Sequence, residues 1–182
     1  MPLPTPLYEP DAAQGTVLYA ACTLNSQVPA GLRVTVAGVA AQVSLSRHAG
    51  RDVVEARFDV PPGRTLQLQH GTVAFDTDRP RSSGRVEFGV VSLVDTPIVN
   101  NANPAPGMEK YHLPVTAPLP GGMAMPGGRV DRHFWLASYL DLADADEVWL
   151  SLPPFTVDGS PATLPRLHFR RRYVVVGAVL NC

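Results

Sequence analysis

Three consecutive arginines, Arg170, Arg171 and Arg172, stand directly before a run of valines in the stretch LHFRRRYVVV. Guanidinium groups bind phosphates and carboxylates through paired hydrogen bonds, so such a run could hold a nucleic acid, a phosphate or an acidic partner. The chemical role of the run depends on which carboxylates the fold places opposite it.

An acidic run precedes the arginines and offers them partners within the chain. If residues 146–152 and 166–172 pair as antiparallel strands with Leu152 opposite Arg166, Trp149 faces Phe169. The same register pairs acidic with basic residues; the two predicted ion pairs are Glu147 with Arg171 and Asp146 with Arg172. The pattern favours a solvated strand end with internal ion pairs. Phosphate contact and a salt bridge between subunits remain open alternatives.

The other reactive residue types form no recognisable catalytic pattern. No two of the five histidines stand at the close spacings of a helical or zinc-finger metal site. The sequence contains no G-x-S-x-G motif, and no helix is expected after the glycines of PGGMAMPGG to bind a phosphate. Two weaker pairs are Asp131 with His133 and Glu109 with His112. We therefore predict a protein that is not an enzyme, with no catalytic residue, metal or cofactor.

Several aromatic residues could act at a binding surface. Phe134 and Trp135 are consecutive, and neighbours on a strand point to opposite faces, so one of them is expected in the core and the other at the surface. Exposed tryptophan and tyrosine can anchor a protein interface or stack on sugar rings. The predicted interaction residues are Tyr8, Tyr111, Trp135, Tyr139 and Trp149.

The two cysteines, Cys22 and Cys182, are too few and too far apart for a zinc site. Cys22 lies in an apolar run, which is typical of a buried free thiol. A disulfide between the two is the alternative, and it would require an oxidising compartment.

Composition limits the classes of partner. The 182 residues carry a formal net charge of −1, which gives no general attraction to nucleic acid or to anionic membranes. No apolar run approaches the roughly 20 residues of a membrane-spanning helix, and the first residues lack the pattern of a signal peptide. We expect a cytoplasmic protein or a part of an exported or virion assembly. Fourteen arginines against one lysine suggest a GC-rich genome, bacterial or phage.

Alternating patterns predict an all-β fold. In VVEARFDV, Val54, Ala56, Phe58 and Val60 share one face, and Pro61 and the residues after it end the strand. Abundant valine, proline and glycine indicate many short strands joined by turns. We predict a two-sheet antiparallel β-sandwich, immunoglobulin-like or jelly-roll, with a closed barrel as the alternative. A proline-rich extended arm over 1–15 precedes a single domain over 16–182, which contains an irregular excursion over 95–129.

These expectations favour a structural role. We predict a subunit of a bacterial or phage assembly (a virion, tail, filament or surface component) that acts through contacts with copies of itself or with other subunits, and not through nucleic acid or membrane insertion. The first alternative is a β-sandwich module that binds a carbohydrate or an envelope component through Trp135 or Trp149. The second is a jelly-roll metalloenzyme that uses Glu109, His112 or His133.

Overall fold

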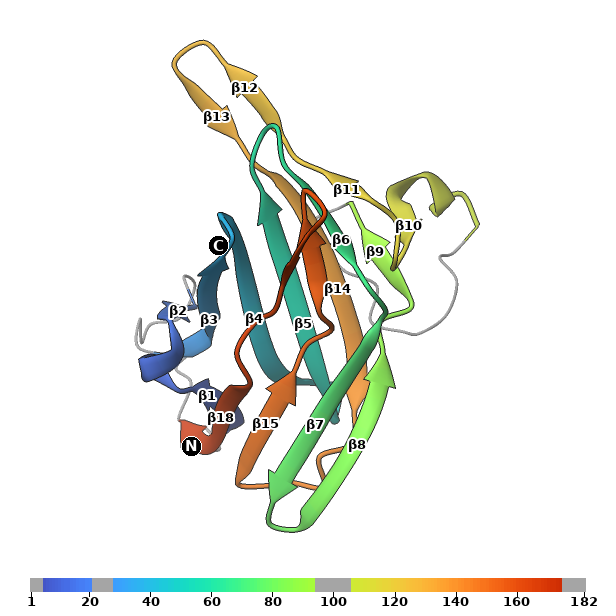
Figure 1. Cartoon of the computed structure of the whole chain (residues 1–182). Coiled ribbons are helices and arrows are strands. Elements are labelled where there is room, and N and C mark those ends of the chain that lie inside the picture. Colours follow the sequence, from blue (N-terminus) through green and yellow to red (C-terminus); the bar gives the residue numbers. More distant parts are fainter. Residues whose placement is uncertain (1–4, 21–27, 94–105, 175–182) are drawn as a thin grey trace.

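The computed structural model describes residues 5–20, 28–93 and 106–174, and these residues are nearly all β (Figure 1). Within these ranges there is no α-helix, and two short 3-10 turns occur, η1 (Ala12–Gln14) and η2 (Glu109–Tyr111). The strands form several antiparallel sheets, none of which closes into a barrel in the described part of the chain. None of the described residues belongs to a helix long and apolar enough to cross a membrane.

The large sheet has seven strands in the order β10-β9-β14-β5-β4-β3-β2. Its three longest strands have nine or ten residues, and in the middle of β4 and β5 buried and partly exposed side chains alternate. The strands are β2 (Thr16–Tyr19), β3 (Pro29–Val36), β4 (Val39–His48), β5 (Arg51–Val60), β9 (Val90–Ser92), β10 (His112–Pro114) and β14 (Arg132–Leu140).

The second sheet has five strands in the order β1-β18-β15-β7-β8. Residues 5–10, within the predicted N-terminal arm, form β1, which pairs with β18 at the sheet edge, where the missing N–H groups of Pro6 and Pro10 are tolerated. The strands are β1 (Thr5–Pro10), β7 (Thr72–Asp78), β8 (Arg81–Glu87), β15 (Glu147–Ser151) and β18 (Leu167–Val174).

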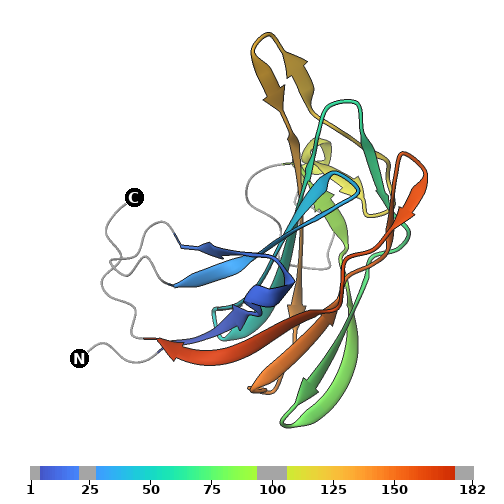
Figure 2. The same cartoon turned by 60° about the vertical axis from the view of Figure 1, so that its left-hand side comes forward.

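Two smaller sheets complete the described structure. One has four strands in the order β11-β6-β16-β17, namely β6 (Thr65–Leu68), β11 (Leu119–Pro120), β16 (Phe155–Val157) and β17 (Ser160–Ala162). The other is a two-stranded ribbon of β12 (Met123–Met125) and β13 (Gly128–Val130), which projects from the rest of the chain in both views (Figures 1 and 2). The predicted irregular excursion over 95–129 therefore contains short strands in the part that the structure describes.

One hydrophobic core collects side chains from the large sheet, the second sheet and the four-stranded sheet. The predicted apolar face of β5 is confirmed, since Val54, Ala56, Phe58 and Val60 are all buried. Phe58 meets Phe155 of β16 edge to face, with ring centroids 5.6 Å apart. Because these contacts join strands far apart in sequence, the sheets depend on one another for burial.

The predicted antiparallel pairing of residues 146–152 with 166–172 is correct, but its register is wrong by one residue. Trp149 faces His168 instead of Phe169, which is buried opposite Val148. The connection after β15 forms the β16–β17 hairpin, which pairs with β6 and does not act as a turn between β15 and β18. A one-residue shift exchanges the two faces of a strand, so Trp149 and Phe169 lie on opposite faces of the second sheet.

Candidate functional site

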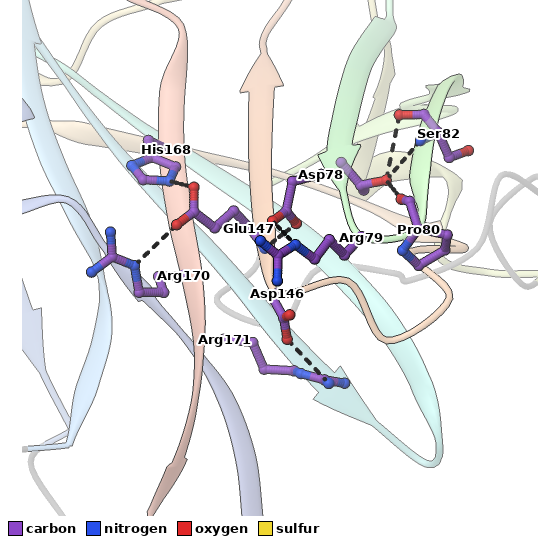
Figure 3. A network of polar contacts seen from close by, with 10 residues as sticks. Asp78, Arg79, Pro80, Ser82, Asp146, Glu147, His168, Arg170 and Arg171 are labelled. Carbon is purple, nitrogen blue, oxygen red and sulfur yellow. Dashed lines mark hydrogen bonds and ion pairs between the residues drawn. The ribbon is translucent and has the colours of Figure 1, made fainter.

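The arginine run of β18 is bound by carboxylates of the same chain. Arg170 Nε lies 3.4 Å from Glu147 Oε1, and Arg171 Nη2 lies 3.5 Å from Asp146 Oδ1 (Figure 3). Arg172 pairs with Glu9 of β1. The acidic and basic runs do face each other, but Glu147 pairs with Arg170 instead of Arg171, and Asp146 pairs with Arg171 instead of Arg172, as the corrected register requires.

Glu147 is the centre of a polar network on the outer face of the second sheet. Its Oε2 lies 3.3 Å from His168 Nε2, and its backbone N–H donates to Asp78 at 2.8 Å (Figure 3). His168 Nδ1 lies 3.5 Å from Asp11, and the His168 backbone N–H donates to Gln14 at 2.7 Å. These contacts fix His168 and attach the segment that follows β1 to β18.

Trp149 stands beside this network at the edge of a hollow. Its ring stacks on His168, with centroids 4.9 Å apart and planes inclined by 10°. Arg166 lies near the same indole, 5.7 Å from the centroid, and its Nη2 donates to Asp76 at 2.6 Å. The hollow has a volume of about 730 Å³ and extends from Trp149 over β7 to Ser83 of β8. The structure therefore combines a fixed aromatic ring with polar groups at one open concavity.

Trp135 lies at a second hollow, on the outer face of the large sheet. The hollow has a volume of about 400 Å³ and is also lined by Tyr19, Glu55 and Arg57. Arg57 lies over the Trp135 ring, 5.1 Å from its centroid, and Trp135 Nε1 is buried without a hydrogen bond among the described residues. Burial raises the pKa of Glu55. Trp135 is half-buried, so it is less available to a ligand than a fully exposed ring.

His133 contacts the carboxylate of Asp59 and not that of Asp131, its predicted partner. Its Nδ1 lies 2.7 Å from Asp59 Oδ1, since the two residues are directly opposite on β14 and β5, while Asp131 pairs with Arg129. Arg57 donates to both oxygens of Asp59 at 2.8 and 3.0 Å. Burial would raise the pKa of Asp59, but the hydrogen bonds from Arg57 and His133 outweigh it and hold this pKa below its usual range. Asp59 therefore serves as a buried anchor for cations.

The predicted tyrosines occupy three different environments. Tyr8 is buried in the core, and its hydroxyl has no hydrogen-bond partner within the described ranges. Burial and the nearby Asp52 carboxylate raise the pKa of Tyr8 to about 12. Tyr139 is half-buried beneath Arg51, whose guanidinium lies 3.6 Å from its ring centroid. Tyr111 is exposed beside Lys110.

The residues of the predicted metalloenzyme alternative have local structural contacts. Glu109 accepts the backbone N–H of Gly107 at 2.7 Å, and His112 is buried with its Nδ1 2.6 Å from the Met108 carbonyl oxygen. Among the described residues, no three side chains of His, Cys, Asp or Glu come together as a metal site would require. Cys22 and Cys182 lie outside the described residues.

The ribbon of β12 and β13 presents an exposed apolar face whose residues were not among the predicted interaction residues. Met123 and Met125 share one face of β12, and Val130 lies directly opposite Met123. These side chains are 65%, 54% and 52% exposed. The sequence signal was the short apolar stretch MAM between glycine pairs, but only the projection of the ribbon shows that the core does not cover it.

Comparison of the chain with protein-family models, with curated proteins and with solved structures found no significant match.

Proposed function

We propose that this chain is a subunit of a larger assembly and acts through protein–protein contacts made by the β12–β13 ribbon, with a second copy of the same chain as the partner. The observation that carries the proposal is the amphipathic ribbon. One face carries Met123, Met125 and Val130, and the other carries Ala124 opposite Arg129. Methionine is flexible and polarisable, which suits a contact surface.

The low stability expected of an uncovered ribbon supports the proposal that a partner covers it. A two-stranded ribbon without a covered face is marginally stable in water, and this one has only three residues in each strand. Covering three half-exposed apolar side chains would stabilise it through the hydrophobic effect. A chain whose net charge is −1 also gives two copies little reason to repel each other.

The overall arrangement that we propose for this subunit is a β-sandwich, immunoglobulin-like or jelly-roll, in which the large sheet and the second sheet pack face to face. The shared core supports this, because Phe58 and Leu136 of the large sheet and Val148 and Phe169 of the second sheet belong to one buried cluster. Determination of the structure by crystallography tests the arrangement. We expect the two sheets to face each other across the core, and sheets that do not would contradict it.

The molar mass of the purified chain, measured by light scattering over a range of concentrations, tests the proposed assembly. We expect a mass above that of one chain that grows with concentration. The double variant Met123→Asp/Met125→Asp should weaken association by about tenfold or more, since it places charge on the contact. The matched control is Ser160→Asp/Thr163→Asp, which adds the same charge at exposed positions in and beside β17. A wild-type chain that stays a monomer throughout contradicts the proposal.

A further inference from the structure

The hollow beside Trp149 has the features of a ligand site that assembly does not require. It lies on the outer face of the second sheet, where β15, β7 and β8 run side by side (Figure 1). We propose that it binds a neutral saccharide, with one sugar ring stacked on the indole of Trp149. This inference is independent of the proposed assembly.

Trp149 lies on a central strand of the second sheet, between β18 and β7, and its side chain lines the hollow. On β18 its opposite residue is His168, whose imidazole stacks on the indole in nearly parallel planes. On β7 its opposite residue is Asp76. The imidazole covers one face of the indole, and Trp149 also lines the hollow. Because Glu147, Asp11 and Gln14 hold His168 in place, the indole is supported before any ligand arrives.

Arg166 lies over the Trp149 ring at a greater distance than a closely stacked guanidinium. Its guanidinium carbon is 5.7 Å from the Trp149 centroid, whereas Arg51, which does stack, lies 3.6 Å from the centroid of Tyr139. The ion pair with Asp76 engages the Arg166 guanidinium. Trp149 therefore brings an aromatic ring to the hollow next to charged groups, which suits a ligand ring whose faces bear C–H groups and whose rim bears hydroxyls.

The polar lining matches a ligand that both donates and accepts hydrogen bonds. Asp76 offers carboxylate oxygens and Arg166 offers N–H donors, and both side chains are about half exposed. Ser82 and Ser83 add exposed hydroxyl groups from β8. Neighbouring hydroxyls of a sugar can donate to the carboxylate and accept from the guanidinium, so both partners of the ion pair would be used.

The charge balance of the hollow favours a neutral ligand. Two carboxylates, of Asp76 and Asp78, and two guanidinium groups, of Arg81 and Arg166, line it. A phosphate or a uronic acid would meet the carboxylates, and a purely apolar ligand would leave the charged groups desolvated and unpaired. The volume of about 730 Å³ is larger than a single sugar ring, which points to a segment of an oligosaccharide.

The test follows the two tryptophan side chains separately. The chain holds two tryptophans, so a nitrogen-15-labelled sample gives two indole N–H signals in NMR, which Trp135→Phe assigns. Neutral oligosaccharides of glucose, xylose, mannose and N-acetylglucosamine are titrated in turn into the full chain. We expect at least one of them to shift the Trp149 signal in a saturable manner and to leave the Trp135 signal in place.

Variants separate stacking from a merely structural role of Trp149. Trp149→Ala should weaken binding of that oligosaccharide by about tenfold or more, and Trp149→Phe, which keeps an aromatic face, should weaken it less. Asp76→Asn should also weaken binding, while Trp135→Phe should bind like the wild type. Retained backbone spectra establish that each variant is folded.

Three outcomes would overturn the inference. The first is that no neutral oligosaccharide shifts the Trp149 signal at millimolar concentration. The second is that the shifts occur at Trp135 alone, which would place the site on the large sheet. The third is that inorganic phosphate or an acidic oligosaccharide shifts the Trp149 signal at lower concentration than any neutral one, which would assign the hollow to anions.

Discussion

Asp59 is 3% exposed and is the least exposed charged side chain among the described residues. It accepts hydrogen bonds from Arg57, Gln42 and His133, and Arg33 lies 3.7 Å away. A buried carboxylate is stable only when such partners replace water. These partners come from four neighbouring strands of the large sheet, so the single charge of Asp59 couples β3, β4, β5 and β14.

Replacing this carboxylate with an amide should destabilise the fold. We expect Asp59→Asn to lower the free energy of unfolding by about 2–3 kcal/mol near neutral pH, because Arg57 and His133 lose a charged acceptor. Urea unfolding of the wild type and the variant measures the difference. Asp158→Asn is the control, since Asp158 is an exposed carboxylate paired with Arg64, and it should cost less. Equal losses in the two variants would contradict the anchoring role.

The unfolding free energies of the wild type and of Asp59→Asn should also depend differently on pH. The folded-state pKa of Asp59 lies below its usual value, so the carboxylate stabilises the fold at pH values above the unfolded-state pKa of about 3.9. That contribution is lost as pH falls through the lower folded-state pKa. The stability difference between wild type and Asp59→Asn should therefore shrink on acidification below about pH 4, and a difference that stays constant down to pH 2 would rule out the shift.

The pKa of Tyr8 is shifted in the opposite direction to that of Asp59, since it is raised to about 12. The raised pKa means that its contribution to stability is present below the ordinary tyrosine value of about 10 and is lost as pH rises through 12. We expect Tyr8→Phe to change stability by less than about 1 kcal/mol at neutral pH, because the buried hydroxyl has no partner among the described residues. Above pH 10 the variant should become the more stable protein, as measured by urea unfolding alongside tyrosinate absorbance. A variant that loses stability in parallel with the wild type would contradict the raised pKa.

At the scale of elements, the β12–β13 ribbon depends on the glycine at its base. A Cβ added at Gly122 would lie 1.7 Å from the carbonyl oxygen of Val130, whereas one added at Gly128, in the same ribbon, would meet nothing within 4 Å. Backbone atoms cannot move aside as a flexible side chain can. Gly122 therefore lets β12 leave the body of the protein in close contact with the strand that returns.

Gly122→Ala should accordingly cost about 2 kcal/mol or more in unfolding free energy, while Gly128→Ala should be tolerated. Thermal and urea unfolding measure both variants. If the ribbon carries the proposed contact, Gly122→Ala should also weaken self-association in light scattering. Equal stability of the two alanine variants would show that the base of the ribbon is not tightly constrained.

Strand identity could be predicted from the sequence wherever one face is buried, as in β5, because alternation along a strand is a local property. Register and partners depend on distant residues. The pairing of Asp59 with His133 requires the alignment of β5 with β14, and the hollow beside Trp149 requires Asp76, Trp149 and His168 to be opposite one another on three strands. No spacing within the sequence encodes these alignments. The connection between β15 and β18 is not a short turn that would fix their register, because it contains the β16–β17 hairpin.

At the scale of the whole molecule, ion pairs join segments that are far apart in the sequence. Arg47 of β4 binds Asp52 of β5 and also Asp144 in the connection between β14 and β15, and Arg171 of β18 lies 3.3 Å from the same Asp144. The charged side chains of this cluster come from both the large sheet and the second sheet, so the cluster links the two. Charges engaged in this way within one chain are poor candidates for holding a partner.

The salt dependence of self-association should therefore distinguish an apolar contact from a charged one. Raising NaCl from about 0.1 M to about 1 M shortens the Debye length from about 10 Å to about 3 Å, which weakens exposed ion pairs. Sulfate instead strengthens the burial of apolar surface. If Met123, Met125 and Val130 form the contact, sedimentation velocity should show association that NaCl changes little and sulfate increases. Dissociation of the complexes in NaCl would instead indicate that the interface lies at the exposed arginines of β18, Arg170 and Arg172, and not at the ribbon.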